Sequence, residues 1–190
     1  MRWRTTLYTI GHSTHAIGDF IGMLERYAIE VLVDVRTVPQ SRRNPQFGQQ
    51  SLRQSLQSAG IEYVHMKCLG GLRPPAKDST VNAGWRNKSF RGYADYMQTP
   101  EFGSAVEELI ELGAQKRTAM MCAEAVPWRC HRSLVGDALL VRGVEVIDIM
   151  NADKSMSHAL TPFADVAGTD ITYPAAQGAL GLPPATEGAD

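Results

Sequence analysis

The sequence predicts an α/β fold with a mostly parallel β-sheet flanked by helices. Short β-rich or apolar runs alternate along the chain with segments whose apolar residues recur at helical spacing. The run EVLVDVR (30–36) is almost continuously apolar, as is typical of strands buried on both faces of a parallel sheet. Strands that alternate with helices form such sheets through right-handed crossover connections.

The N-terminal half is expected to contain three strands and two helices. The strands are TLYTI (6–10), EVLVDVR and IEYVHM (61–66), and a loop with prolines and arginines, TVPQSRRNPQF (37–47), follows the second. Gly60 is expected to end the second helix. Apolar residues at helical spacing define the two helices, and they are Ile17, Phe20, Ile21 and Leu24 in the first and Leu52, Leu56 and Ala59 in the second.

The C-terminal half begins with a long polar segment, residues 68–87, which we expect to border the site and to move, because loops of this length in compact domains are usually functional or mobile. Pro100 separates the next two helices, and Gly143 ends a later one. The elements expected here are helices over 90–99 and 100–115, a strand over 117–122, a helix over 131–143 and a last core strand over 144–150.

Length and composition favour one domain, expected over residues 1–174, with a flexible tail over 175–190 that is rich in Ala, Gly and Pro. The formal net charge of −1 excludes a protein that is basic overall, so contact with nucleic acid would need a local basic patch. We find neither a signal peptide nor an apolar run long enough to cross a membrane, and we expect a cytoplasmic protein without membrane contact. Three cysteines do not suggest a disulfide framework.

Polar residues follow four of the expected strands at their carboxyl ends. Ligands of open α/β sheets bind outside these ends, so the four clusters predict one site at that edge. Strand ends also carry polar residues simply because loops are exposed, and His12 and Ser13 could instead cap the first helix. The clusters are Gly11, His12 and Ser13, then Asp34 and Arg36, then His65 with Leu69, Gly70 and Gly71, and last Cys122 and Glu124.

Several motifs, in the same order, resemble the domain-of-unknown-function family 488 over roughly Leu7 to Pro174. They are YTIGHS, LVDVRTVPQSRRNPQF, YVHMKCLGG, YADYM, MCAEAVPWRCHRSLV and HALTPFADVAGTDITYP. The resemblance implies a bacterial or archaeal α/β domain without a settled reaction. It singles out His12, Ser13, Asp34, Arg36, Pro39, Ser41, Gly70, Gly71, Cys122, Glu124, Cys130, His131 and Arg132 as the family's motif residues.

The segment from Cys122 to Arg132 carries the most reactive chemistry of the chain. A loop before a helix N-terminus presents backbone N–H groups that lower a thiol pKa and favour anions, and Arg129 and Arg132 add permanent charge. The spacing of Cys122 and Arg129 differs from the cysteine loops of rhodaneses and tyrosine phosphatases, and Glu124 adds a negative charge. Glu124 is better interpreted as a general acid or base, or as an acceptor for an amine of the substrate.

Three further interpretations of the cysteines stay open. Zinc could be held by Cys122, Cys130 and His131 with a ligand from a neighbouring loop, although the spacing is not that of a structural zinc site. Cys122 and Cys130 could form a redox pair, or Cys122 could be an inert core residue. No cofactor is required by the sequence, and zinc is the possible one.

The resulting hypothesis is a thiol-dependent enzyme of unknown reaction that acts on an anionic small molecule, a nucleotide or a nucleic-acid segment. The alternative is a non-catalytic nucleic-acid or nucleotide binding module whose cysteines are structural or metal-bound. The predicted catalytic residues are Cys122, Glu124, His131 and Asp34, and the predicted substrate-binding residues are His12, Ser13, Arg36, Ser41, Gly70, Gly71, Arg129 and Arg132.

Overall fold

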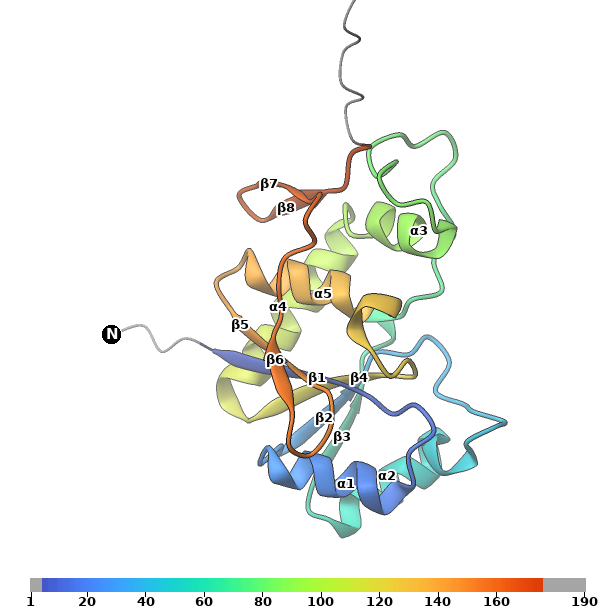
Figure 1. Cartoon of the computed structure of the whole chain (residues 1–190), viewed down its shortest axis with the longest axis vertical. Coiled ribbons are helices and arrows are strands. Elements are labelled where there is room, and N and C mark those ends of the chain that lie inside the picture. The colour runs from blue at the N-terminus through green and yellow to red at the C-terminus, as the bar shows by residue number, and fades with distance from the viewer. Residues whose placement is uncertain (1–4, 176–190) are drawn as a thin grey trace, which may run out of the picture.

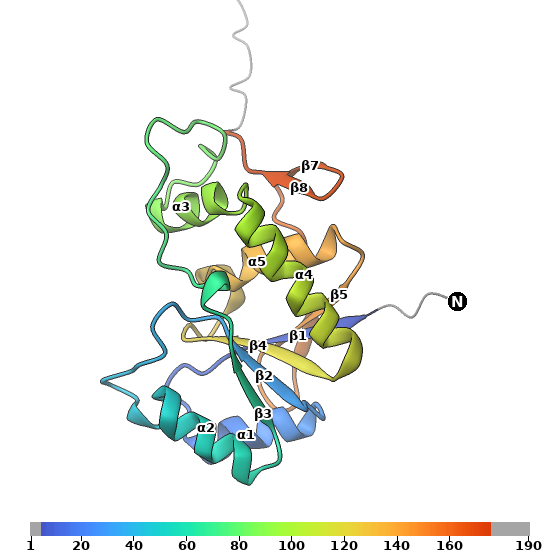
Figure 2. The ribbon, with the colours of Figure 1, turned by 180° about the vertical axis from the view of Figure 1, so that it is seen from behind.

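The structure is a computed structural model that describes residues 5–175, shown from two sides in Figures 1 and 2. Its helices are α1 (Ile17–Arg26), α2 (Gln49–Ser58), α3 (Lys88–Tyr96), α4 (Pro100–Gln115) and α5 (Arg132–Leu140). Its strands are β1 (Thr6–Gly11), β2 (Val31–Asp34), β3 (Glu62–His65), β4 (Thr118–Cys122), β5 (Glu145–Ile149), β6 (Ser155–Ser157), β7 (Asp165–Ala167) and β8 (Asp170–Thr172). The predicted α/β class is confirmed.

The main sheet has six strands in the order β3-β2-β4-β1-β5-β6, and only β6 is antiparallel to its neighbour. Strand β4 lies between β1 and β2, so Cys122 pairs with Gly11 on one side while Met121 pairs with Asp34 on the other. The carboxyl ends of β1, β2 and β4 therefore meet at one edge of the sheet.

Helices cover both faces of the sheet. Helices α1 and α2 lie on one face and α4 and α5 on the other, with α3 and the β7–β8 hairpin beyond α5 (Figures 1 and 2). Side chains alternate between the two cores, because successive strand residues point to opposite faces. In β4, Met121 packs with the α1 and α2 side, whereas Met120 and Cys122 pack with the α4 and α5 side.

Most helix ends follow the expected local signals. Asn87 and Thr99 accept hydrogen bonds from the first turns of α3 and α4, and Gly60 and Gly143 have φ of 73° and 78° after α2 and α5. The expectation that His12 or Ser13 caps the first helix is wrong: α1 begins at Ile17 without a side-chain cap, since both residues are drawn into the loop beside β4.

The C-terminal segment after β5 holds elements that the sequence did not predict. Strand β6 extends the sheet with three exposed residues, and β7 and β8 form a separate hairpin. Such short strands lack a readable alternation of apolar and polar residues. The predicted tail, apart from Ala175, lies outside the described residues. Over residues 5–175 the structure has no helix long and apolar enough to cross a membrane.

His158 ties this C-terminal segment to the sheet and to α5. Its ring nitrogens lie 2.9 Å from a carboxylate oxygen of Asp148 and 3.1 Å from one of Asp137, and all three side chains are buried. Tyr173 also donates to Asp137, at 2.8 Å. Burial opposes the charged imidazolium, but the hydrogen bonds that it donates to Asp137 and Asp148 raise the pKa of His158 to about 9. The charged ring thus bridges two buried carboxylates and offsets one of their two negative charges.

We expect the free energy of unfolding to fall as the pH rises from about 7 to about 10. His158 has a higher pKa folded than unfolded, so its contribution is complete below its ordinary value of 6.5 and is lost as the pH passes about 9. The loss is on the order of 2 kcal/mol after allowance for solvent screening. Urea unfolding followed by circular dichroism at several pH values measures it.

The matched control for this effect is His158→Gln. Without a titrating ring, the variant is less stable at neutral pH, and its unfolding midpoint changes less between pH 7 and 10 than that of the wild type. Equal pH dependence in the two proteins would show that His158 is not the group responsible.

Candidate functional site

The carboxyl ends of β1, β2 and β4 open into a cleft of about 780 Å³. This volume is typical of sites for small organic ligands. Its inner end is formed by residues that follow β1, β2 and β4, and its outer end by the loop after β2 and the start of α3. Residues that border it include His12, Ser13, Arg36, Ser41, Arg42, Arg43, Gly71, Leu72, Phe90, Cys122, Glu124, Arg129, Cys130 and His131.

Gly11 allows the loop after β4 to pass directly over the end of β1. A Cβ at this position would lie 1.9 Å from the carbonyl oxygen of Glu124, which excludes any larger residue. The backbone N–H groups of His12 and Ser13 donate to the carbonyls of Cys122 and Ala123, both at 2.9 Å. These bonds continue the parallel pairing beyond the sheet and fix the loop that begins at Cys122.

Asp34 and Arg36 form a buried ion pair beneath the cleft. Nε and Nη2 of Arg36 donate to the two carboxylate oxygens of Asp34 at 2.9 and 2.6 Å. Tyr63 donates to the same carboxylate at 2.8 Å, and the carbonyl of Phe47 accepts from Nη2 at 2.9 Å. Although burial opposes its charge, Asp34 raises the pKa of Arg36. Because Asp34 is fully buried, its carboxylate lies on the side of the Arg36 guanidinium that faces away from the cleft.

His12 lies beside this ion pair as a neutral ring. Burial, together with the charge of Arg36, lowers the pKa of His12 to about 4. The ring stacks on Phe47, with centroids 4.3 Å apart, and Nδ1 lies 2.9 Å from the carbonyl oxygen of Ser13. A neutral ring that donates from Nδ1 leaves Nε2 as an acceptor, and Nη1 of Arg36 lies 3.3 Å from it. His12 and Asp34 thus orient Arg36 from two sides.

Cys122 ends β4 with its sulfur at the inner end of the cleft, and its side chain is 7% exposed. The neighbouring thiol of Cys130 favours the thiolate of Cys122 and lowers the pKa of Cys122 despite its burial. Backbone N–H groups of Ala123 and Glu124 and the charge of Arg132 act in the same direction. The neighbouring Cys122 thiol and burial raise the pKa of Cys130 well above its usual range.

His131 is oriented so that one ring nitrogen faces both thiols. Nε2 lies 3.1 Å from the carbonyl oxygen of Val35, so this nitrogen carries the proton in the neutral ring. Nδ1, which is then unprotonated, lies 3.8 Å from the sulfur of Cys122 and 3.7 Å from that of Cys130. A Cβ on Gly71 would lie 2.4 Å from Nδ1, and the ring of Tyr93 packs nearby at 4.9 Å between centroids.

Arg132 holds the cysteine loop from behind. It is buried, and its guanidinium donates to the carbonyls of Glu124 at 2.5 Å and Ala125 at 3.0 Å. Its Nε has no hydrogen-bond partner among the described residues. Because these bonds point two carbonyls away from the cleft, Arg132 positions the loop that carries Cys122.

Cationic and apolar side chains share the mouth of the cleft. Arg42, Arg43 and Arg129 border it, as do Val38 and Leu72, which are 55% and 73% exposed. Exposed apolar side chains beside arginines are suited to a ligand with an anionic group and an apolar or aromatic body. The uncharged side chain of Ser41 also borders the cleft.

The long polar segment borders the cleft only at its start. Gly71 and Leu72 line the cleft, whereas Asp95 of α3 accepts hydrogen bonds from Ala76, Ser79 and Asn82 and so attaches the middle of the segment to α3. Trp85 packs against Phe90, Phe163 and Tyr173. Arg73 stacks on Tyr96 with its Cζ 3.7 Å from the ring centroid. Movement of this segment stays a prediction.

Cys122, Cys130 and His131 also offer the donors that zinc prefers. Their sulfur and nitrogen ligand atoms all lie within 4.8 Å of one another. Donors of a tetrahedral zinc site lie about 3.5–3.8 Å apart, given bonds of about 2.3 Å to sulfur and 2.0 Å to nitrogen. The carbonyl of Val35 would fix the outer nitrogen of His131, as is usual for metal-bound histidines. These residues could therefore hold a zinc ion with one position facing the cleft.

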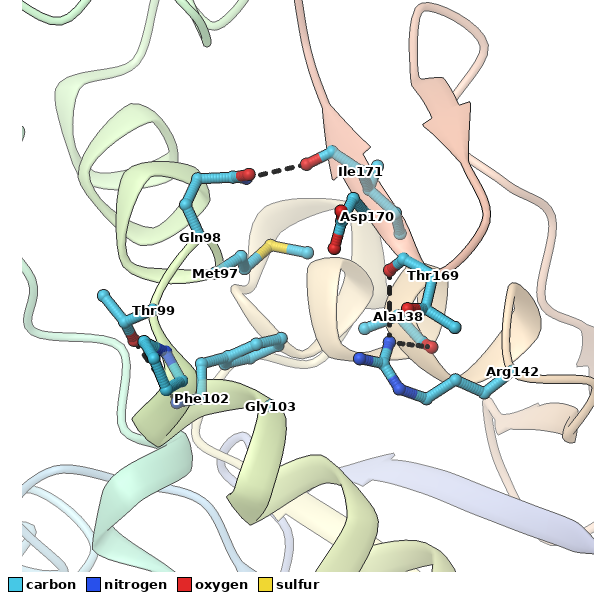
Figure 3. Close-up of a pocket in the computed structure, with 11 residues that line it drawn as sticks. Met97, Gln98, Thr99, Phe102, Gly103, Ala138, Arg142, Thr169, Asp170 and Ile171 are labelled. Atoms are coloured by element: carbon cyan, nitrogen blue, oxygen red, sulfur yellow. Dashed lines mark hydrogen bonds between the residues drawn. The ribbon is translucent and has the colours of Figure 1, made fainter.

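A second cavity of about 250 Å³ lies between α4, α5 and the β7–β8 hairpin (Figure 3). Arg142 on its wall already donates to the carbonyls of Ala138 and Thr169. Of the described residues that line it, none is a cysteine or a histidine. The thiol-bearing cleft is thus the better candidate for chemistry.

The structure brings nine of the predicted site residues to the cleft, while Asp34, Gly70 and Arg132 lie behind it. Gly70 packs against Thr37, where a Cβ would lie 2.8 Å from its Cα. Sequence reasoning did not place Phe90 in the site, and it considered Cys130 only as a family motif residue, a zinc ligand or a redox partner of Cys122. Phe90 lies at the start of α3, far along the chain from the strand ends, and no local signal marks it. The nine are His12, Ser13, Arg36, Ser41, Gly71, Cys122, Glu124, Arg129 and His131.

Sheet and cleft together define an α/β protein with a cysteine and histidine pair at the carboxyl edge of a parallel sheet. Residues 16–139 match the family model described as domain of unknown function DUF488, and the chain belongs to this family. The family resemblance stated from the sequence motifs is confirmed over these residues, which exclude the motifs YTIGHS and HALTPFADVAGTDITYP. Searches of curated proteins and of solved structures gave no match.

We expect Gly71→Ala to displace His131 and to change the reactivity of Cys122. The added Cβ would lie 2.4 Å from Nδ1, and overpacking of this kind costs about 1–3 kcal/mol. Thermal unfolding and the rate of Cys122 alkylation measure the two effects. Gly103→Ala in α4 is the control, because its Cβ would have nothing within 4 Å and its helical position favours alanine. If Gly71→Ala changed neither the stability nor the rate of Cys122 alkylation, this result would contradict a role of Gly71 in holding the ring of His131 in place.

Proposed function

We propose that this protein is a thiol-dependent enzyme whose cleft binds an anionic small molecule or nucleotide and reacts with it through Cys122. The observation that carries the proposal is the pair formed by Cys122 and the unprotonated Nδ1 of His131, 3.8 Å apart at the inner end of a cleft bordered by arginines. A thiol beside an oriented base is the usual arrangement for nucleophilic catalysis by cysteine.

In this proposal Cys122 is the nucleophile and His131 accepts its proton. The backbone N–H groups of Ala123 and Glu124, which already act on the sulfur, would also stabilise negative charge that develops beside it. Glu124 borders the cleft and serves as a general acid or base, or as an acceptor for an amine of the substrate. The two thiols need a reducing compartment, which is consistent with the expected cytoplasmic location.

The anionic group of the ligand is assigned to Arg36 and Arg129, with Arg42 and Arg43 attracting it at the mouth. Asp34 and His12 position Arg36, and Arg132, Gly70 and Gly71 position the loops around the thiol. The hydroxyls of Ser13 and Ser41 are available as donors to the ligand.

The proposal predicts that Cys122 prefers anionic alkylating reagents. Iodoacetate and iodoacetamide have similar shapes but differ in charge, so the ratio of their rates at Cys122 reports the field of the cleft. We expect Arg129→Gln to lower this ratio roughly 3- to 10-fold. Mass spectrometry follows Cys122 and the exposed Cys68 in the same sample, after metal analysis and chelator treatment.

Arg53→Gln is the matched control, since Arg53 is an exposed residue of α2 and does not border the cleft. It should leave the ratio at Cys122 unchanged, and neither variant should alter the ratio at Cys68. If neither the Arg129→Gln substitution nor added salt changed the ratio of rates at Cys122, this result would contradict the anion site. If the wild-type protein contained stoichiometric zinc and the Cys130→Ser variant did not, the thiols would instead be metal ligands.

The alternative of a non-catalytic nucleic-acid module is favoured by one observation. Trp128 is 59% exposed and directly precedes Arg129, and exposed aromatics beside arginines stack single-stranded bases. This module would bind labelled oligothymidylate in a salt-dependent manner, and Trp128→Ala would weaken it about 10-fold. Val81→Ala, at another exposed apolar residue, is the control. The enzyme proposal expects no such loss and an unchanged iodoacetate ratio in Trp128→Ala.

A further inference from the structure

Cys130 has no part in the chemistry proposed above, yet it borders the cleft beside Cys122. Its side chain is 3% exposed, and its sulfur, the sulfur of Cys122 and Nδ1 of His131 all lie within 4.8 Å of one another. Both sulfurs also contact Nδ1 of His131, at 3.8 Å from Cys122 and 3.7 Å from Cys130. Simple packing would be served by any small apolar residue, whereas the S–H group supplies a donor and a second redox-active sulfur.

The sulfurs of the two cysteines lie within 4.8 Å of each other across the loop that joins these residues. It contains a single short turn, Pro127–Arg129, and its carbonyls at Glu124 and Ala125 are held by Arg132. A disulfide needs its sulfurs about 2.05 Å apart, so one or both side chains must rotate toward each other. Cys130 lies outside α5, which begins at Arg132, so this rotation does not break the helix.

We propose that Cys122 and Cys130 are a hydroperoxide-reactive dithiol, in which Cys122 is oxidised first and Cys130 then closes a disulfide with it. The inference rests on the proposed function in so far as both need a reactive thiolate at Cys122. It goes beyond that function because it assigns a role to Cys130 and a second class of reactant, the hydroperoxides.

The two steps balance with the hydroperoxide as the only oxidant. The Cys122 thiolate attacks the terminal oxygen of the hydroperoxide, the O–O bond breaks, and the alkoxide or hydroxide that leaves takes up a proton. This yields a sulfenic acid at Cys122 and an alcohol or water. The sulfur of Cys130 then attacks the sulfur of Cys122, the S–O bond breaks, and a disulfide and water form.

His131 provides the place for the proton in the second step. Its Nδ1 lies 3.7 Å from the sulfur of Cys130, so it can take the thiol proton and pass it to the departing hydroxide. Cys122 is the more exposed of the two cysteines, 7% against 3%, and it ends β4 at the cleft, so Cys122 meets the oxidant and Cys130 resolves the product.

The exposed Cys68 is the internal reference for the test. Reduced, chelator-treated wild-type protein is exposed to hydrogen peroxide, its remaining thiols are blocked with N-ethylmaleimide, and its peptides are analysed by mass spectrometry. We expect loss of two hydrogens, a linked Cys122–Cys130 peptide, and oxidation of Cys122 roughly 10-fold faster than that of Cys68. Dithiothreitol should restore both thiols.

Cys130→Ser is the decisive variant and Cys68→Ser the matched control. Without Cys130, Cys122 should gain two or three oxygens that dithiothreitol does not remove, whereas Cys68→Ser should behave as the wild type. A Cys122 that is oxidised without forming the disulfide in the wild type overturns this inference and leaves the proposed function intact. A Cys122 that reacts with neither peroxide nor iodoacetate overturns both, and this wild-type result does not depend on the folding of any variant.

Discussion

The parallel pairing of β4 with both β1 and β2 is the constraint on which the site depends. Its register sets Cys122 beside Gly11 and Met121 beside Asp34, so three chain segments that are distant in sequence end at one edge of the sheet. The backbone bonds from His12 and Ser13 then extend this pairing into the cysteine loop. A shift of one residue in β4 would turn Cys122 toward the α1 and α2 face, away from His131.

Buried charge supports this arrangement at two places. The carboxylate of Asp34 is surrounded by donors from Arg36 and Tyr63, and those of Asp137 and Asp148 share His158. Buried charges are tolerated only when their hydrogen-bonding capacity is met, and removal of one partner typically costs about 3–5 kcal/mol. One cluster orients the guanidinium at the cleft, whereas the other fastens the C-terminal segment to the sheet.

The sequence predicted the class of fold and the five parallel strands, and nine of its twelve predicted site residues border the cleft, because each strand end carries its own polar cluster. It did not predict which polar residues would turn inward. Asp34 was predicted to be catalytic and Arg132 to bind substrate, but Asp34 pairs with Arg36 and Arg132 donates to backbone carbonyls. Phe90 and the hairpin were missed for a different reason: their positions follow from tertiary packing, and the short strands β6 to β8 lack a periodic pattern.

The polar strand β6 has a consequence for how the molecule behaves among its own copies. An unpaired sheet edge offers backbone groups to any passing strand, and intermolecular β-pairing of this kind begins aggregation. Here the edge next to β5 ends in three exposed residues, two of them serines, that run against the direction of the parallel sheet. So short a border, with Met156 as its single apolar residue, gives an incoming chain few backbone groups to pair with, and it shields the apolar strands behind it from self-association.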